Sequence, residues 1–244
     1  MTTAYLVYFF ILQGLGLAEA IPLAMLFTVV LGLAVFEVHS RFAVNPFSFM
    51  MGMLLSSLLL QYVYSYLFGG EEGLTIPGIV SSTSISFFSV SVNPGFILSG
   101  GVSLALMVAV WLWIERTSMG RRIRATSSDP EAARLFGIDV RRTTVVVFVV
   151  STLLVSTAAI LLVPSGTVTP EMWLEPFVIA FAVSIMAGLG DFRWVLPAAF
   201  LISFGQVIAQ YALPYDVSDI VAFALVVVAI SIRPTGLGGG KGEH

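Results

Sequence analysis

Long segments without a single charged residue dominate this sequence and restrict its fold more than any other feature. Residues 143–163, for example, contain only aliphatic, small and hydroxyl side chains and one phenylalanine. A helix needs about 20 predominantly apolar residues to span a bilayer. With only 10% charged residues, the chain has too little polar surface to enclose such segments in water. It is therefore predicted to be an integral membrane protein, which excludes soluble α/β, disordered and nucleic-acid-binding proteins.

The apolar segments are typical of helices rather than barrel strands. Residues 105–112 and 145–150 are apolar on every side, whereas a transmembrane barrel strand alternates polar and apolar residues over about ten positions. We expect an all-α, polytopic transmembrane helix bundle of about eight spans, in which the first two spans are either separate or one broken helix. The spans are expected at residues 5–17, 21–36, 47–67, 96–114, 143–163, 177–189, 195–213 and 220–232.

The placement of arginine predicts the orientation of the bundle. Seven of the 11 basic residues lie in the loop of residues 115–142, and cytoplasmic loops carry the excess of Lys and Arg. With eight spans, all 11 basic residues and both termini are cytoplasmic, and the purely acidic loops lie outside. We therefore predict a single transmembrane domain, residues 1–244, with a cytoplasmic loop at 115–142 and an extracytoplasmic loop at 68–95.

The outer loop contains a candidate hairpin. Residues 84–92 mostly alternate polar and apolar side chains and are followed by Asn93-Pro94, a turn-forming pair. A short hairpin at this position is either a docking surface or a cap on the loop.

The cytoplasmic loop contains a short segment with a complete set of helix boundary signals. Asp129 suits the N-cap, Pro130 the first helical position and Gly137 the position after the C-cap. The resulting helix has about two turns, so it needs its own bundle or a partner protein to hold it. A short, partly apolar helix of this kind suits insertion into a groove of another protein. The residues assigned to this contact are Asp129, Glu131, Ala132, Ala133, Arg134, Leu135, Phe136, Gly137 and Ile138.

The basic residues 115–125 either extend the preceding helix, lie along anionic head groups or only fix the topology. The run ERTSMGR at residues 115–121, followed by ARLFGID at 133–139, resembles the cytoplasmic loop of the branched-chain amino acid ABC transporter permease family. The run RPTGLGG at 233–239 is similar to the segment that closes the last helix of these permeases. Together the two matches cover about half of the chain.

The resemblance implies a function and a set of partners. The loop would contain the coupling helix that contacts the ATPase subunit, and the chain would be a permease in a bacterial or archaeal cytoplasmic (inner) membrane. The implied partners are two cytoplasmic ABC ATPase subunits, a second homologous permease subunit and an extracytoplasmic solute-binding protein.

The sequence itself offers no site for catalysis. The glycine-rich run GGGKG at 238–242 lacks the Ser or Thr and the preceding strand of a P-loop. The two histidines, His39 and His244, have no second metal ligand at helical spacing. We therefore expect no enzyme activity, metal or cofactor in this chain, and the resemblance implies ATP and Mg on the partner subunits.

The polar residues inside the later spans are neutral, which argues against ion coupling through carboxylates. Such side chains either line the path of a neutral or zwitterionic solute or bond one helix to another. Gln206 and Gln210 are four residues apart and so share a helix face. The residues proposed to line a path are Gln61, Ser184, Ser203, Gln206 and Gln210.

Three functional hypotheses follow. The first is the permease subunit of an ABC importer, moving an amino acid or similar small polar solute and energised by cytoplasmic ATPases. The second is a self-contained carrier or channel, and the third is a membrane scaffold without its own pathway. Copurification of a soluble ATPase separates the first hypothesis from the other two.

Overall fold

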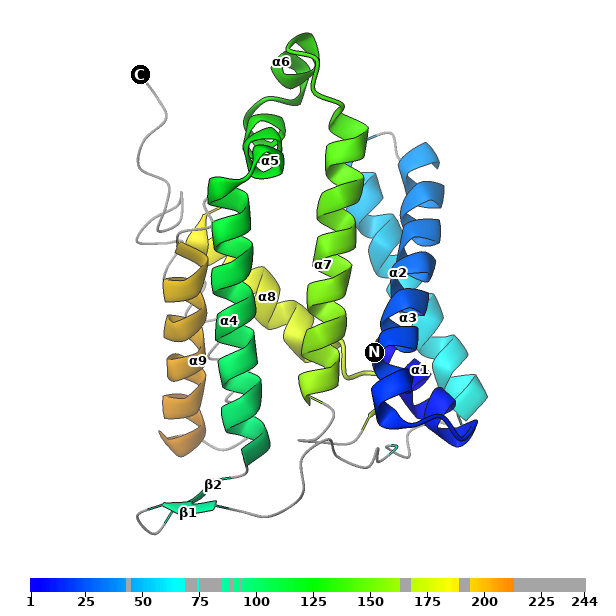
Figure 1. Cartoon of the computed structure of the whole chain (residues 1–244), viewed down its shortest axis with the longest axis vertical. Coiled ribbons are helices and arrows are strands. Elements are labelled where there is room, and N and C mark those ends of the chain that lie inside the picture. Colours follow the sequence, from blue (N-terminus) through cyan, green and yellow to red (C-terminus); the bar gives the residue numbers. More distant parts are fainter. Residues whose placement is uncertain are drawn as a thin grey trace. The chain divides into compact units, whose positions relative to one another are not determined.

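A computed structural model describes residues 1–42, 45–68, 74, 85–87, 90–92, 94–162, 168–188 and 194–212 (Figure 1). The chain divides into two compact units, Met1–Met172 and Trp173–His244, and each is described by itself. The helices of the first unit are α1 (Thr2–Leu12), α2 (Leu17–Phe42), α3 (Pro46–Phe68), α4 (Pro94–Arg116), α5 (Ser118–Ser128), α6 (Pro130–Leu135) and α7 (Val140–Leu162). The helices of the second unit are α8 (Leu174–Ala187) and α9 (Val195–Ala212).

Four helices of the first unit, α2, α3, α4 and α7, are long and apolar enough to cross a membrane. Of these, α3, α4 and α7 have the same length, 23 residues each. The helices α1, α8 and α9 are apolar but shorter. Seven of the eight expected spans overlap a described helix, and the eighth, residues 220–232, lies outside the described residues. The helical class is therefore confirmed. Within the described residues, four of the eight expected spans coincide with helices of membrane length, and the total of eight spans and their orientation stay predictions.

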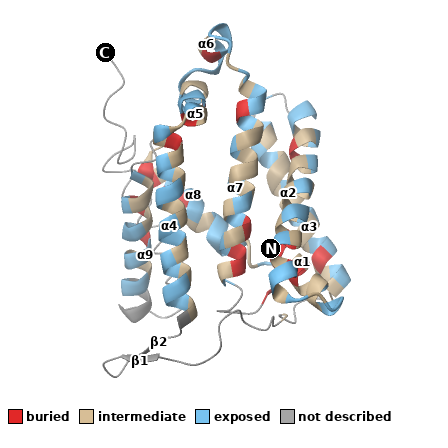
Figure 2. Ribbon diagram, viewed as in Figure 1, coloured by how far each residue is buried: buried red, intermediate tan, exposed pale blue. Residues whose placement is uncertain are grey.

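Large apolar side chains on these helices are exposed, as Figure 2 shows by the pale blue on α3 and α4. Leu55 on α3 is 67% exposed and Ile97 on α4 is 62% exposed. Water-soluble monomers rarely expose contiguous apolar surface of this kind. The outward faces of the helices therefore fit lipid better than water.

The first two helices, α1 and α2, are separate helices rather than one broken helix. Gly14 has a φ of +88°, a conformation that glycine adopts without strain. Its N–H donates to Ile11 and the N–H of Leu15 donates to Phe10, the paired bonds of a Schellman C-cap. The helix α1 therefore ends at Leu12, five residues before the predicted end of the first span.

Three hydroxyl groups join α1, α2 and α7. The Oγ1 atom of Thr3 lies 3.1 Å from Oγ1 of Thr28 and 3.1 Å from Oγ of Ser156. Thr3 and Ser156 are buried, at 3% and 0% exposure. We call these three residues the hydroxyl hub. Beside it, the rings of Tyr5 and Tyr64 stack with their centroids 4.9 Å apart, which brings α3 into the same core.

The second unit is a helix pair with a core of small and medium apolar residues. Ala182, Met186 and Ala187 of α8 are buried together with Ala198 and Ile202 of α9. Small residues allow two helix backbones to approach closely, as is common between membrane helices.

The predicted hairpin is present. Strands β1 (Ile85–Phe87) and β2 (Val90–Val92) pair antiparallel, with Ile85 opposite Val92 and Phe87 opposite Val90. Its alternative roles as a docking surface or a loop cap both stay predictions.

Candidate functional site

A tight corner joins α4 to the basic helix α5. The helix α4 ends at Arg116, and Thr117 caps α5 by accepting a hydrogen bond from the Gly120 N–H at 3.1 Å. The Arg124 guanidinium donates to the carbonyl oxygen of Ile114, one of the last carbonyls of α4. Of the three alternatives for residues 115–125, a continuous extension of the preceding helix is therefore wrong, because α5 is a new helix with its own cap.

The short helix α6 has the boundaries that its sequence predicts. The Asp129 carboxylate accepts hydrogen bonds from the N–H groups of Glu131 and Ala132 at 2.9 and 3.0 Å. At the other end, Gly137 has a φ of +77°, and its N–H donates to Arg134. The Ile138 N–H donates to Ala133, which completes a Schellman motif. Both ends of a six-residue helix are thus held by specific bonds.

The caps hold two large apolar side chains away from the rest of the unit. Leu135 is 89% exposed and Phe136 is 86% exposed, while Ala133 on the same helix is 3% exposed. Figure 1 shows α6 beyond the ends of α4 and α7. An exposed apolar pair on a fixed, projecting helix is suited to contact with another protein rather than to packing within the chain.

Replacing Asp129 with alanine is expected to loosen α6. Loss of an N-cap costs about 1 kcal/mol, which corresponds to about a five-fold larger population of the unwound segment. Trypsin cleavage after Arg134, followed by mass spectrometry of the membrane-embedded chain, is expected to accelerate by that factor. Asp129→Asn preserves the cap and should be cleaved at the wild-type rate. Equal acceleration in both variants would show that the cap does not hold the helix.

A cavity of about 410 Å³ lies among α1, α2, α3 and α7 in the first unit. Its wall combines hydroxyl side chains with aliphatic and aromatic ones, and no charged residue is among the described residues that line it. A solute in contact with this lining would meet hydroxyl and apolar groups rather than a fixed charge. The lining residues with hydroxyl groups are Thr2, Thr28, Ser56, Ser57, Ser151 and Thr152.

Several of these hydroxyl groups are already bonded to the protein. Ser57 donates to Leu54 at 2.7 Å and Thr152 to Phe148 at 2.8 Å, both within their own helix. The Ser56 hydroxyl lies 3.3 Å from Nε2 of His39. Because the other ring nitrogen of His39 lies 2.8 Å from the carbonyl oxygen of Val35, that nitrogen donates, and in the neutral ring Nε2 accepts from Ser56. His39 therefore joins α2 to α3.

The predicted path residues fall in both units. Gln61 is half-buried on α3 of the first unit. Ser184 and Ser203 are exposed on α8 and α9, and the Ser184 hydroxyl donates to the Ala180 carbonyl at 2.8 Å. Gln206 is half-buried on α9, and the side chain of Gln210 lies outside the described residues. Gln61 is not among the residues that line the cavity of the first unit, and the role of all five residues in a path stays a prediction.

The ion pair between Glu37 and Arg141 was not predicted from the sequence. The Glu37 carboxylate on α2 accepts two hydrogen bonds from Nη2 of Arg141 on α7, at 2.6 and 2.8 Å. Arg41, four residues after Glu37, donates to the same carboxylate at 3.0 Å. The four-residue spacing of Glu37 and Arg41 is a readable signal for the second bond. The bond between Glu37 and Arg141 joins residues 104 positions apart, so no local sequence pattern could indicate it.

The fold and these features define a polytopic helical membrane protein with a projecting, capped helix and an uncharged cavity. Residues 1–230 match the family described as branched-chain amino acid transport system / permease component. The chain belongs to this family, as its loop and C-terminal motifs predict.

Curated relatives extend this result. The high-affinity branched-chain amino acid transport system permease protein LivH of Salmonella typhimurium is 25% identical over 186 residues, which cover 74% of this chain and 60% of LivH. The autoinducer 2 import system permease protein LsrD of Photorhabdus luminescens is 26% identical over 242 residues, 92% of this chain and 69% of LsrD. The fructose import permease protein FrcC of Rhizobium meliloti is 27% identical over 174 residues, 67% of this chain and 47% of FrcC. No solved structure matches the chain.

The chain spans about 60% of the length of LivH. The family match and the helical membrane fold apply to this chain. The partners and the solute of the whole transporter are proposals.

Proposed function

We propose that this chain is the permease subunit of an ABC importer in a cytoplasmic membrane, with ATP hydrolysed by separate cytoplasmic subunits. The observation that carries the proposal is the geometry of α6, where both ends of a short helix are capped and Leu135 and Phe136 project from it. Family membership supports the same role. In this proposal α6 is the coupling helix, and it occupies a groove of an ATPase subunit.

The mechanism that we propose uses α6 as a rigid connector. Closure of the ATPase subunits moves α6, and the movement passes into α5 on one side and α7 on the other, because α6 packs against both. Such movement of packed helices is a common way to switch a membrane bundle between states. Two ATPase subunits with ATP and Mg, a second homologous permease and an extracytoplasmic solute-binding protein complete the proposed assembly.

The solute that we propose is an amino acid or a similar small polar compound without net charge. The uncharged, hydroxyl-containing cavity supports this class. The relatives carry names that refer to branched-chain amino acids, to fructose and to autoinducer 2, so both amino-acid-like and sugar-like solutes belong in the first binding assays.

Purification of the tagged chain in mild detergent, from the membranes of its own cell, tests the proposal. The expected result is a stoichiometric soluble subunit with a P-loop sequence and ATP hydrolysis in the purified complex. A chain that purifies without such a subunit, and transports solute after reconstitution alone, would instead be a self-contained carrier. Purification without an ATPase or transport would support the scaffold hypothesis.

A further inference from the structure

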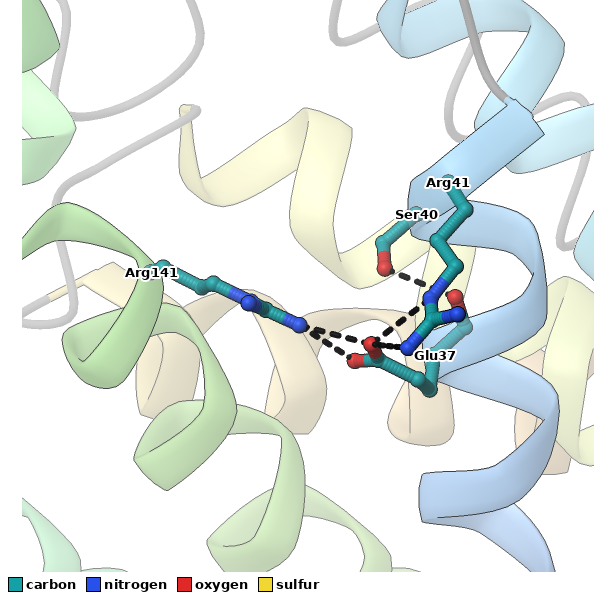
Figure 3. A network of polar contacts seen from close by, with 4 residues as sticks. All are labelled: Glu37, Ser40, Arg41 and Arg141. Atoms are coloured by element: carbon teal, nitrogen blue, oxygen red, sulfur yellow. Dashed lines mark hydrogen bonds and ion pairs between the residues drawn. The ribbon is translucent and has the colours of Figure 1, made fainter.

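Glu37 connects the ends of α2 and α7 on the side of the unit where α6 lies. Figure 3 shows its carboxylate between two guanidinium groups, Arg141 of α7 and Arg41 of its own helix. The contact with Arg141 uses both carboxylate oxygens, at 2.6 and 2.8 Å. Arg41 lies one helical turn after Glu37, with its Nη2 2.9 Å from the carboxylate. One carboxylate is thus shared between a partner on the same helix and a partner on another helix.

The opposite part of the α2–α7 contact is held in a different way. There the hydroxyl hub, Thr3, Thr28 and Ser156, joins both helices to α1 through bonds of 3.1 Å, and Thr3 and Ser156 are buried. Separating the buried hydroxyl groups of Thr3 and Ser156 is costly, because each would lose this hydrogen bond away from water, whereas Thr28 also donates to the Ala24 carbonyl of its own helix. This part of the contact is therefore expected to stay closed.

Between the two ends, α2 and α7 form walls of the cavity. The rings of Phe36 and Phe148 have centroids 4.8 Å apart. A Cβ atom built at Gly32 would lie 3.3 Å from the Phe148 ring and 3.6 Å from the Thr152 methyl group. Gly32, Phe148 and Thr152 all line the cavity. Separation of the helices at the Glu37 end would therefore open the cavity along this contact.

The ion pair between Glu37 and Arg141 can be broken at a small cost in free energy. The side chain of Arg141 is 70% exposed and that of Glu37 is 35% exposed, and ion pairs between exposed groups add little stability and are screened by salt. When Arg141 leaves, Glu37 keeps Arg41 as a partner, so the carboxylate is not left without a counter-charge. The bond that Glu37 keeps with Arg41 lowers the free-energy cost of opening.

Arg141 is also directly connected to α6. Only Phe136 to Val140 separate α6 from Arg141, and Asp139 fixes the start of α7 by accepting a hydrogen bond from the Arg142 N–H at 2.9 Å. Movement of α6 therefore carries Arg141 with it. We infer that the Glu37–Arg141 pair is a releasable latch, that α7 swings about the hydroxyl hub when the latch opens, and that this opens the cavity toward α6. Arg141 and Glu37 are positioning residues in this device.

The latch can be tested without knowledge of the solute. The chain has no cysteine, so a single cysteine at Thr152 reports access to the α2–α7 contact in the full chain in native membranes. Its labelling rate with a membrane-impermeant thiol reagent is expected to rise about two- to five-fold in Arg141→Glu, the change in population typical of an exposed ion pair. Raising the salt concentration is expected to increase labelling in the wild-type background and not in Glu37→Gln, which has lost the latch already.

Two further variants make the result specific. The exchange Glu37→Arg with Arg141→Glu restores an ion pair between α2 and α7 with its charges reversed, and is expected to bring labelling back toward the wild-type rate. Arg142→Glu makes the same change of charge one residue later, at a guanidinium without an ion-pair partner among the described residues, and should leave labelling unchanged. Failure of the exchange to restore slow labelling, or equal acceleration by Arg142→Glu, would overturn the latch.

That an ATPase opens the latch by moving α6 rests on the proposed function. The experiments distinguish failure of the latch from failure of the importer proposal. If the ATPase copurifies and labelling is the same in wild type, Arg141→Glu and Glu37→Gln, the latch is wrong and the importer proposal stands. If labelling follows the charge pattern but no ATPase copurifies, the latch is right and something other than an ATPase drives it.

Discussion

Replacing both Leu135 and Phe136 with aspartate is expected to separate this chain from its ATP-hydrolysing partner. These side chains are 89% and 86% exposed, so the chain itself gains little stability from them and the folded bundle should be retained. In the proposed complex they are buried in a groove. Burial of one large apolar side chain contributes about 1.5–3 kcal/mol, so the loss of two should weaken binding by about a hundred-fold or more.

The measurement is the amount of ATPase retained when the tagged variant is purified at matched expression. Phe42→Asp is the matched control, because Phe42 is also a highly exposed phenylalanine, at 80%, at the end of α2. It should retain the ATPase at the wild-type level. Full retention by the Leu135/Phe136 variant would show that α6 is not the docking element, and loss in both variants would indicate a general effect of aspartate on membrane assembly.

Replacing Gly120 with alanine is expected to destabilise the first unit. A Cβ atom at this position would lie 2.6 Å from Cα of Ile114, and closer still to the Ile114 carbonyl group. Both groups are backbone, so the collision can be relieved only by moving α5 away from α4. Forced overpacking of this kind costs about 1–3 kcal/mol. The movement would also disturb the bond from Arg124 to the Ile114 carbonyl.

Gly100→Ala gives a matched comparison within α4, since nothing lies within 4 Å of a Cβ atom at that position. This change should leave stability unchanged or raise it by up to about 1 kcal/mol, because alanine favours the helix. Thermal unfolding in detergent, followed by the loss of monodisperse protein on size-exclusion chromatography, measures both. Equal midpoints for the two variants would mean that the corner between α4 and α5 tolerates a side chain.

The parts of this fold that follow from local chemistry could be predicted from the sequence. The boundaries of α6 are an example, because Asp129, Pro130 and Gly137 act on backbone groups only a few residues away. The helical class and most span positions follow in the same way from runs of apolar residues. The end of α1 at Leu12 was harder, because Leu15 and Leu17 continue the apolar pattern beyond the Gly14 cap.

The parts that depend on contacts between distant residues could not be predicted. Thr3 and Ser156 are 153 positions apart, and a hydroxyl group in an apolar span gives no sign of which neighbour it meets. The same is true of Glu37 and Arg141. For the cavity, the neutral polar composition was readable, but the set of hydroxyl groups that gather around it depends on how α1, α2, α3 and α7 cross.

The equal lengths of α3, α4 and α7 have a consequence for the bilayer in which the chain works. At 1.5 Å per residue, 23 residues extend over roughly 34 Å, slightly more than a hydrocarbon core of about 30 Å. In a thinner or thicker bilayer, a helix adjusts by tilting at a modest cost per ångström of mismatch. Each of the three helices is therefore long enough to span the bilayer with some tilt, and the packing of each helix against its neighbours, rather than the shared length, sets how far it tilts.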